Sequence, residues 1–578
     1  MKSDLQKAIA LCRSSFASAG FFSLFINFLM LVPALYMLQL YDRVVTSGSE
    51  ATLVMLTLMM VLLMATMGGL EWVRSQMMVR VSVRLEKLLN KRVFGLAFKQ
   101  ALYVGSKRSP SQPLDDLSGL RQFLTGNGLF AFFDAPWMPI YIAVMFMFHE
   151  WFGWMAVGTV IILTILTFIN EKLTAETLKE ANDNSMVGRA LVQKNLRNAE
   201  VVESMGMLAG IRKRWLDSVN EVLFLQSKAS SRAASLTSLS KTIRILSQSL
   251  ILGLGGYLVI QQQITPGLMI AGSILLGRAL APIDMMIGSW KSFVAARGQY
   301  ARLNEALLAV PEEKEKMTLP APEGELWVDQ ILVAPPGSTE PVLAGINFSL
   351  KPGESLAIVG PSAAGKSTLA RVILGIWPVL RGKVRIDSVD VFSWNREELG
   401  PYIGYLPQDI ELFEGSIAEN ISRFGEMDSD MIVAAAKLSD VHEMILSLPE
   451  GYDTVIGHSG GVLSGGQRQR IGLARAVYGE PKLILLDEPN SNLDEVGEQA
   501  LAKAIVALKQ KNITVIVISH RTGIVEVLDK MLVLKGGEMV AFGPRDEVLN
   551  KLQQKHSSAV APKNTNSVGR SLTVTPSA

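Results

Sequence analysis

Long stretches with almost no charge constrain the fold of this chain more than any other feature. Residues 21–70, 136–170 and 245–283 together contain only five charged side chains: Asp42, Arg43, Glu50, Glu150 and Arg278. A helix needs about 20 mainly apolar residues to cross a bilayer. The N-terminal half is therefore predicted to be embedded in a lipid bilayer, whereas the residues after about 300 read as soluble protein. The net charge of +3 is too balanced to indicate a nucleic-acid binder.

Six apolar stretches are long enough to span a membrane: residues 21–40, 52–70, 132–148, 152–170, 243–260 and 265–288. Lys and Arg gather in the connections 71–135 and 171–242, while the other three turns hold only Arg43 between them. Because cytoplasmic loops retain positive charge, both termini are predicted to be cytoplasmic. The third stretch contains Asp134, Pro136 and Pro139, which suggests a shorter, kinked or interfacial span.

The two basic connections repeat apolar residues at helical spacing, as in Val79, Val83, Leu85, Leu88, Leu89, Val93 and Leu96. We expect them to extend the spans into the cytosol, with turns at Gly105–Pro113 and near Gly206–Gly210. Polar residues also occur in the first and sixth spans: Asn27, Tyr36, Gln39 and Asp284. Intramembrane polar groups either line a translocation route or bond neighbouring helices, and the sequence leaves both interpretations open.

The single cysteine, Cys12, excludes an internal disulfide framework and Cys-based zinc sites. The Pro- and Glu-rich stretch 311–324 lacks apolar periodicity and is predicted to be a linker. The expected domains are therefore a six-span membrane domain at 1–310, the linker at 311–324, a soluble domain at 325–554 and a disordered tail at 555–578.

A phosphate-binding loop is predicted at the start of the soluble domain. The apolar strand Ser355–Val359 runs into a GxxxxGK[ST] pattern and then into a helical run from Leu369. The expected nucleotide contacts are Gly360, Pro361, Ser362, Ala363, Ala364, Gly365, Lys366, Ser367 and Thr368. Backbone amides and the helix N-terminus favour phosphate, Lys366 reaches the β and γ oxygens, and Ser367 ligates Mg²⁺.

A second apolar run, Leu483–Leu486, ends in the carboxylates Asp487 and Glu488. Its lack of alternation is typical of a parallel strand buried on both faces. Acidic residues at a strand end are often helix caps, but together with a phosphate loop they favour catalysis. We expect Asp487 to hold Mg²⁺ and Glu488 to act as the base for the attacking water.

Between these elements lies Leu463-Ser-Gly-Gly-Gln467, directly before a helical run. Here the sequence resembles the ATP-binding-cassette family, whose signature peptide is this LSGGQ. The resemblance implies that the peptide completes the nucleotide site of a second subunit, and hence a homodimer. The residues expected to contact that nucleotide are Ser464, Gly465, Gly466 and Gln467.

The same resemblance assigns further positions. Gln408 matches the Q-loop glutamine that senses Mg²⁺ and couples to the membrane domain, Asp494 matches the D-loop, and His520 matches the switch histidine. The resemblance thus makes Gln408 both a catalytic residue and a metal ligand. Two positions depart from the family pattern. No aromatic residue stands near Ala334 to stack on adenine, and His458 falls in a motif where exporters tend to carry glutamate.

Five further segments resemble type I secretion exporters of the protease, lipase and haem-carrier branch: Tyr36–Val45 with Ser47-Gly48, Phe133–Trp137, Pro266–Ala271, Gly277–Pro282 and Ala334–Ser338. The resemblance implies an all-α six-helix exporter-type membrane domain fused to an α/β P-loop cassette. It also implies ATP and Mg²⁺ as cofactors. With only about twenty residues before the first span, no N-terminal peptidase domain is expected.

The implied function is ATP-driven export of unfolded polypeptides with an uncleaved C-terminal signal. The chain would be a multi-pass protein of the Gram-negative inner membrane with its cassette in the cytoplasm. The implied partners are a periplasmic membrane-fusion protein, an outer-membrane channel protein and the secreted polypeptide. The alternative is a homodimeric lipid or drug exporter.

Overall fold

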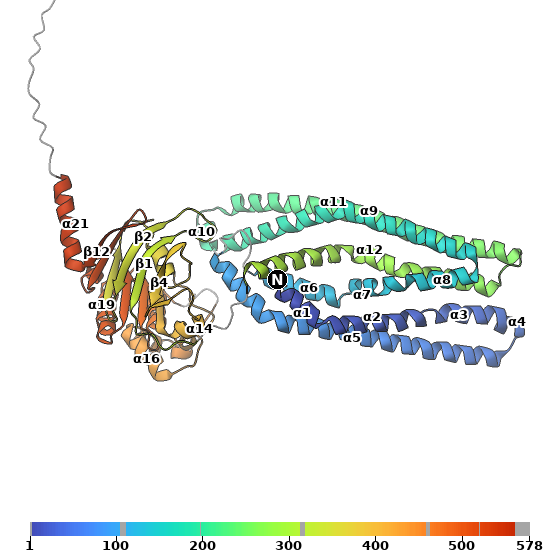
Figure 1. The fold of residues 1–578 in the computed structure, drawn as a ribbon, viewed down its shortest axis with the longest axis horizontal. Helices are drawn as coiled ribbons and strands as arrows, with labels where there is room; N and C mark the ends of the chain where they lie inside the picture. Colours follow the sequence, from blue (N-terminus) through green and yellow to red (C-terminus); the bar gives the residue numbers. More distant parts are fainter. Residues whose placement is uncertain are drawn as a thin grey trace, which may run out of the picture. The chain divides into compact units, whose positions relative to one another are not determined.

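The chain forms two compact units, Met1–Glu312 and Glu313–Ala578. The computed structural model describes residues 3–103, 111–196, 198–311, 318–457, 463–519 and 521–560 (Figure 1).

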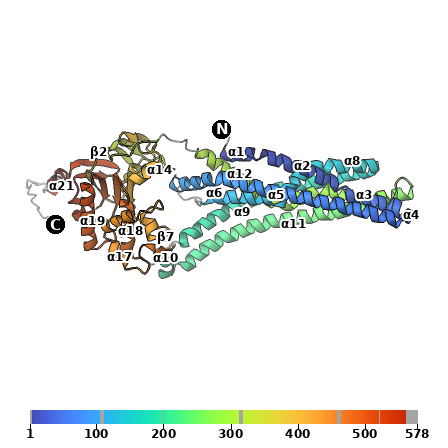
Figure 2. The ribbon, with the colours of Figure 1, turned by 90° about the horizontal axis from the view of Figure 1, so that it is seen from below.

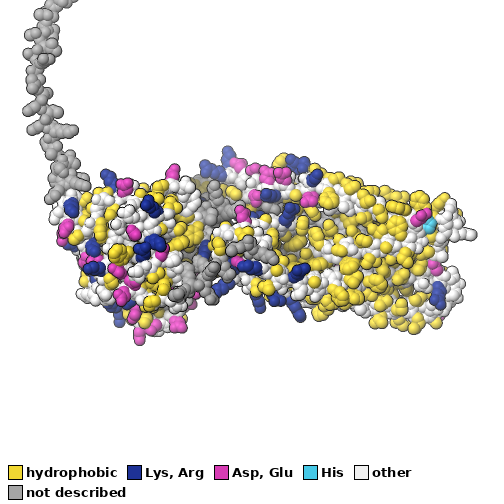
Figure 3. Space-filling view, viewed as in Figure 1, with side chains coloured by type: hydrophobic (Ala, Val, Ile, Leu, Met, Phe, Trp, Pro, Cys, Tyr) yellow, Lys and Arg dark blue, Asp and Glu magenta, His cyan; other side chains and the backbone are white. Residues whose placement is uncertain are grey.

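The first unit is all helical, and its described residues contain six helices long and apolar enough to cross a membrane. They are Arg13–Ser47, Glu50–Tyr103, Gly128–Phe148, Glu150–Leu196, Leu208–Ile260 and Pro266–Ala309. Five of the six predicted stretches lie within these helices, and the sixth, 265–288, begins one residue before its helix. The expectation of six spans is therefore confirmed. Figure 3 shows apolar side chains covering most of one face of this unit, away from the charged region.

Four helices continue far beyond their apolar parts: α5 (Glu50–Tyr103), α9 (Glu150–Leu196), α11 (Leu208–Ile260) and α12 (Pro266–Ala309). The 54 residues of α5 rise about 80 Å, whereas a bilayer core is about 30 Å thick. Helices α9 and α11 lie side by side over much of their length (Figures 1 and 2). The predicted helical extensions are therefore present.

The turn expected near Gly206–Gly210 follows the short helix α10 (Ala199–Ser204), where Gly206 has a φ of +64°. Most of the other expected turn, at Gly105–Pro113, lies outside the described residues.

The first span is segmented. After the short helix α1 (Asp4–Leu11), it consists of α2 (Arg13–Leu29), α3 (Val32–Gln39), a π-helical turn η1 (Leu40–Val44) and α4 (Val45–Ser47). Gly48, at φ +62°, ends the last segment in the left-handed conformation that glycine adopts without strain.

The third span is kinked. Preceded by α6 (Gln112–Thr125), it runs from α7 (Asn127–Asp134) through a 3₁₀ turn at Ala135–Trp137 into α8 (Met138–Phe148). Because proline lacks the backbone N–H of a regular helix, Pro136 and Pro139 account for the break. Of the three forms considered for this span, the kinked one is observed.

Three of the four polar residues noted in the first and sixth spans bond neighbouring helices. Asn27 donates to Asp134 at 3.0 Å, and Asp134 also pairs with the buried Arg74 at 2.8 Å. The Tyr36 hydroxyl lies 3.0 Å from that of Thr57. Asp284 pairs with Arg244 of α11 at 3.1 Å. In this structure, Asn27, Tyr36 and Asp284 thus follow the helix-bonding interpretation.

The second unit contains a mostly parallel six-stranded sheet in the order β12-β11-β3-β10-β9-β6. Its strands are β3 (Ser355–Val359), β6 (Ile403–Leu406), β9 (Leu483–Asp487), β10 (Thr514–Ile518), β11 (Lys530–Lys535) and β12 (Glu538–Pro544). Strands β9 and β10 are buried at every position, as their unbroken apolar sequences predict. Only the β11–β12 pair is antiparallel.

An antiparallel sheet, β2-β1-β4-β5, packs beside it through a shared apolar core. Its strands are β1 (Leu326–Val333), β2 (Leu343–Leu350), β4 (Arg381–Ile386) and β5 (Val389–Asp390). A short pair joins β7 (Gly415–Ser416) to β8 (Val455–Ile456). The helices are α13 (Lys366–Ile373), α14 (Arg396–Leu399), α15 (Ile417–Ile421), α16 (Ser429–Leu438), α17 (His442–Leu446), α18 (Gly465–Val477), α19 (Glu495–Gln510), α20 (Thr522–Val525) and α21 (Arg545–Val560).

Both ends of this unit differ from the predicted boundaries. The second half of the predicted linker packs on the cassette, because Asp387 accepts the backbone N–H groups of Gly324 and Glu325 at 3.4 and 2.9 Å. Leu319 also packs against its core. At the other end, α21 continues to Val560, six residues past the predicted boundary at 554. Residues 561–578 lie outside the described residues.

Candidate functional site

The predicted phosphate loop connects the buried strand β3 to the N-terminus of α13. Within it, the Ala364 N–H donates to the Pro361 carbonyl at 3.2 Å, which closes a tight turn. A Cβ on Gly360 would lie 2.2 Å from the Leu534 carbonyl oxygen. Gly365 has a φ of +95°, and a Cβ there would lie 2.5 Å from Leu343. Both glycines are thus required for the loop to fit against its neighbours.

Lys366 is 8% exposed and lies across this loop. Its ammonium donates to the carbonyls of Gly360 and Pro361 at 2.7 and 3.1 Å. The positive end of α13 begins at the same residue, so a buried cation and free backbone amides coincide. This arrangement suits a polyphosphate.

Asp487 and Ser367 lie beside the loop, within interaction range of each other. Burial raises the pKa of Asp487, and the nearby Glu488 charge adds to this, while the Ser367 hydroxyl, Arg371 and Lys366 oppose it. The described residues contain no cluster of three metal-binding side chains. A hydroxyl and a carboxylate beside a phosphate site fit Mg²⁺, which is usually held by one or two carboxylates, water and substrate phosphates.

Glu488 follows at the carboxyl end of β9, in an uncommon conformation. Its φ is +50°, and its N–H donates to the Ile518 carbonyl of β10 at 2.9 Å. The Gln408 side chain, two residues after β6, donates to the Glu488 carboxylate at 3.0 Å. Left-handed backbone at a non-glycine residue is costly and clusters at functional sites. The geometry thus holds Glu488 beside Gln408, directly after Asp487.

The predicted signature forms the beginning of α18. Ser464 is the N-cap: its hydroxyl accepts the Gln467 N–H at 3.2 Å, and the Gln467 side chain accepts the Ser464 N–H at 2.7 Å. This is a capping box, which orients the first turn. Ser464 is exposed, and a Cβ on Gly466 would lie 3.0 Å from the Asn492 carbonyl. An accessible helix N-terminus of this kind favours an anion.

Sequence reasoning missed Gln469. This side chain is 1% exposed, donates to the Pro489 carbonyl and accepts the Asn492 N–H at 3.0 Å. It therefore ties α18 to the loop that follows Glu488. The signal was present, because Gln469 precedes the apolar Leu473 by four residues and so falls on the core-facing side of the helix, where a polar group needs partners.

Asp494 caps α19 by accepting the Gly497 N–H at 2.9 Å, and Arg470 of α18 lies 3.4 Å from it. A hollow of about 220 Å³ borders both Gln408 and the beginning of α18. It is lined by Gln408, Asp409, Ile410, Gly465, Arg468 and Asn492. The predicted residues His520 and His458 lie outside the described residues. Ser519, just before His520, donates to Asn490 at 3.2 Å.

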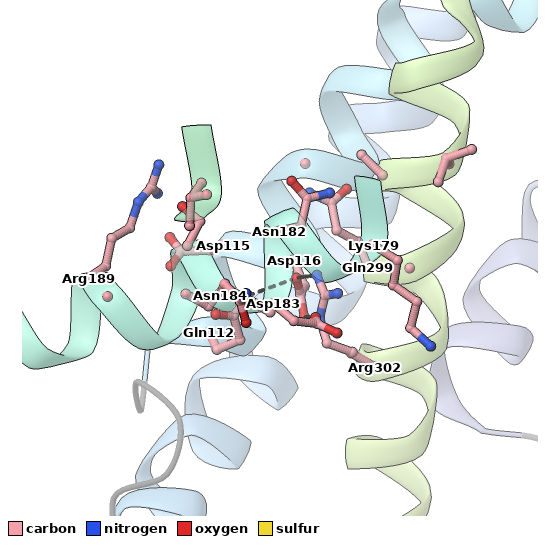
Figure 4. A pocket seen from close by; sticks show the side chains of 18 of the residues that line it. Gln112, Asp115, Asp116, Lys179, Asn182, Asp183, Asn184, Arg189, Gln299 and Arg302 are labelled. Carbon is pink, nitrogen blue, oxygen red and sulfur yellow. Dashed lines mark hydrogen bonds and ion pairs between the residues drawn. The ribbon is translucent and has the colours of Figure 1, made fainter. Parts of the chain in front are cut away.

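A much larger cavity, of about 1960 Å³, lies in the helical extensions of the first unit between α6, α9, α11 and α12. Arg302 of α12 makes a two-pronged ion pair with Asp116 of α6, at 3.1 and 2.6 Å (Figure 4). Charged side chains of both signs line this cavity: Asp115, Asp116, Glu171, Glu176, Asp183, Glu305, Arg121, Lys179, Arg189, Arg297 and Arg302. The cavity therefore suits a hydrated, polar occupant.

A six-span helical unit and a P-loop cassette in one chain define an ABC transporter with membrane and ATPase domains fused. Family models agree: "ABC transporter transmembrane region" matches residues 16–280 and "ABC transporter" matches residues 343–491. The chain is 42% identical over 550 residues to the type I secretion system ATP-binding protein PrsD of Rhizobium meliloti, covering 95% of this chain and 94% of PrsD. The chain belongs to the type I secretion ATP-binding proteins of the ABC transporter family.

Other relatives are more distant. The cyclolysin secretion/processing ATP-binding protein CyaB of Bordetella pertussis is 28% identical, covering 91% of this chain and 75% of CyaB. The leukotoxin translocation ATP-binding protein LktB of Mannheimia glucosida is 27% identical, covering 94% and 77%. A solved bacterial Atm1-family ABC exporter with ATP bound has 23% identity and a TM-score of 0.78, covering 96% of this chain and all of that one. This last likeness shows the exporter fold.

Proposed function

We propose that two copies of this chain form an ATP-driven exporter of unfolded polypeptides in the Gram-negative inner membrane, with the cassettes in the cytoplasm. The membership in the type I secretion proteins over nearly the whole chain carries this proposal. A periplasmic membrane-fusion protein and an outer-membrane channel protein would complete the path across the second membrane. The cargo would carry an uncleaved C-terminal signal.

In the proposed site, the chain's own residues bind ATP and position water. Lys366 and the loop from Gly360 to Thr368 hold the phosphates, and Ser367, Asp487 and Gln408 would hold Mg²⁺. The metal, when bound, would neutralise charge on the β and γ phosphates. Glu488 accepts the proton of the attacking water, and Gln408 keeps its carboxylate oriented through their hydrogen bond.

The second half of each nucleotide site would come from the other subunit. Ser464, Gly465, Gly466 and Gln467 form an exposed helix N-terminus suited to the γ-phosphate. Asp494 caps the helix after the loop that Gln469 ties to this signature. His520 is proposed as the switch histidine on the strength of its sequence position alone.

The cavity of the membrane unit favours a polypeptide over the alternative cargo, a lipid or drug. Its eleven charged lining residues can hydrogen-bond a polar chain and its water. An apolar molecule would displace water from these charged groups, which costs free energy. An unfolded polypeptide keeps its backbone groups bonded to water or to such side chains.

A direct test uses the purified dimer and the isolated C-terminal segment of a candidate secreted protein. Binding of this segment should change the ATPase rate, since coupling between cargo and nucleotide sites is reciprocal. A scrambled segment of the same composition serves as the control. Drug resistance conferred by this chain alone, with no effect of any signal segment on ATP hydrolysis, would support the lipid or drug exporter instead.

A further inference from the structure

Two segments that mark the secretion-exporter resemblance, Tyr36–Val45 and Pro266–Ala271, have no role in the nucleotide site. The structure brings them together at the end of the membrane unit where α4 lies and where α11 turns into α12 (Figures 1 and 2). This end is opposite to the helical extensions that carry the large cavity. We call it the outer end.

Asp42 makes the polar contact between the two segments. Its carboxylate accepts the Gly267 N–H at 2.9 Å and also accepts a hydrogen bond from the Thr265 hydroxyl. Thr265 is itself the N-cap of α12 and accepts the Leu268 N–H at 3.3 Å. A carboxylate from the first span thus caps the N-terminus of the sixth, where negative charge is favoured.

Three local features of the sequence and backbone accompany this contact. Asp42 lies in the π-helical turn η1, and such turns often occur at functional sites. A Cβ on Gly267 would lie 2.5 Å from the Asp42 carboxylate, so the close approach requires glycine. Pro266, in the first turn of α12, has no backbone N–H. The Gly267 N–H is therefore the first amide of the helix that can donate to Asp42.

The first and sixth spans also pack through apolar side chains. Leu31 and Ala34 share a core with Ala271 and Leu275 of α12. Apolar packing has little directional preference, whereas hydrogen bonds to a carboxylate fix one arrangement. Asp42 is only half-buried, so water can replace its partners when the helices part. The contact is therefore specific and reversible.

We propose that Asp42 and the N-terminus of α12 form a latch that holds the outer end of each subunit closed and parts in every transport cycle. The proposal rests on the export function above. It makes Asp42 a positioning residue, which acts through the helices rather than on cargo or nucleotide. The prediction is that cargo leaves only when the first and sixth spans separate at this point.

A disulfide in place of the contact tests whether it parts. The Cβ position of residue 267 lies 2.6 Å from the Asp42 Cγ, so the two Cβ atoms are at most about 4.1 Å apart. Disulfides need about 3.5–4.5 Å. Because Cys12 is the sole native cysteine and is buried, a C12S background leaves only the engineered pair, D42C with G267C.

In membrane vesicles, we expect the oxidised double variant to bind ATP but to export at least about 10-fold less cargo, with recovery after reduction. Each single-cysteine variant is the control. If the crosslinked protein exports cargo as fast as the reduced protein, the contact does not part during transport, and the proposal is overturned. Absence of export by the wild-type protein under the same conditions would instead count against the export function, so the two failures are distinguishable.

A second variant covers the case in which the disulfide does not form. D42N keeps the size of the side chain but removes its charge, so the latch should open more readily. We expect basal ATPase activity of the purified dimer to rise at least about 3-fold without cargo, and export per ATP to fall. T66A is the matched control, because Thr66 is exposed and bonds only the Leu62 carbonyl of its own helix in the described structure. An unchanged basal rate and coupling ratio in D42N would contradict the latch.

Discussion

The Gln408 amide donates a 3.0 Å hydrogen bond to the Glu488 carboxylate, although the two residues are 80 positions apart. Strands β6 and β9 are neighbours in the sheet, and both residues follow the carboxyl ends of these strands. Gln408, the proposed Q-loop glutamine, and Glu488, the proposed catalytic base, are therefore in direct contact within one chain. A movement of the Q-loop would change the orientation of the base.

This contact makes Glu488→Gln the sharpest test of the base. The amide keeps the shape of the side chain and its bond to Gln408, but it cannot accept a proton. We expect ATP binding to persist while turnover falls at least about 100-fold, the range for loss of a positioned base. Steady-state hydrolysis by the purified protein is the measurement. Near-normal turnover would remove Glu488 from the catalytic role.

Gly360→Ala tests the fit of the phosphate loop. The added Cβ would lie 2.2 Å from the Leu534 carbonyl oxygen, so either the loop or β11 must move. We expect ATP affinity to fall at least about 10-fold in equilibrium nucleotide binding, about 1.4 kcal/mol. Gly400→Ala is the control, because φ there is −50° and nothing lies within 4 Å. Equal losses in both variants would point to a general effect of the substitution.

The motifs of the cassette were predictable from sequence because they are local. The strand, loop and helix around Lys366 are consecutive, and the unbroken apolar run before Asp487 predicts a buried strand. The six spans follow equally from composition. Contacts between distant segments were not predictable, as with Asp42 and Gly267, 225 residues apart.

Other misses have equally physical causes. The Pro- and Glu-rich residues 318–324 carry no periodicity, yet Asp387 binds their backbone amides, and backbone hydrogen bonding leaves no trace in composition. Likewise, the π-helical turn at Leu40–Val44 contains no proline or glycine that would mark the change in hydrogen bonding.

Asp529 provides a prediction about pH. Burial raises the pKa of this carboxyl, but bonds from Lys509 at 2.7 Å and from the Ser355 hydroxyl and N–H at 2.7 and 3.0 Å outweigh it, so the pKa is lowered. A lowered folded-state pKa contributes stability above the ordinary value of 3.8 and loses it as pH falls through the folded value.

Asp529→Asn should therefore destabilise the cassette at pH 7 by about 1 kcal/mol through weaker hydrogen bonds. This corresponds to a fall in Tm of about 2–4 °C for a domain of this size. Thermal unfolding of the full chain in detergent should show the difference from wild type shrinking as pH drops below 3.8. A difference that is constant across pH would mean that the charge of Asp529 is not responsible.

The stretch around Ala334 provides a prediction about the base of the nucleotide. Ala334 is 7% exposed and has no ring to stack on adenine. Since stacking contributes about 1–3 kcal/mol where it exists, we expect little discrimination between ATP and GTP. Hydrolysis rates with each nucleotide at matched concentrations are the measurement. A preference for ATP above about 100-fold would show that another residue recognises the base.

Mixed dimers test whether the nucleotide site is shared between subunits. Lys366 lies at the phosphate loop, whereas Ser464 is exposed at the N-terminus of α18 and bonds its own capping box. If each ATP lies between Lys366 of one subunit and Ser464 of the other, K366A and S464R homodimers should both be inactive. A mixed dimer would then have one site with both motifs intact and one with neither. We expect it to regain ATP binding at one site per dimer, measured by photolabelling with an ATP analogue. Crosslinks between the phosphate loop and the signature that form only within one chain would contradict the shared site.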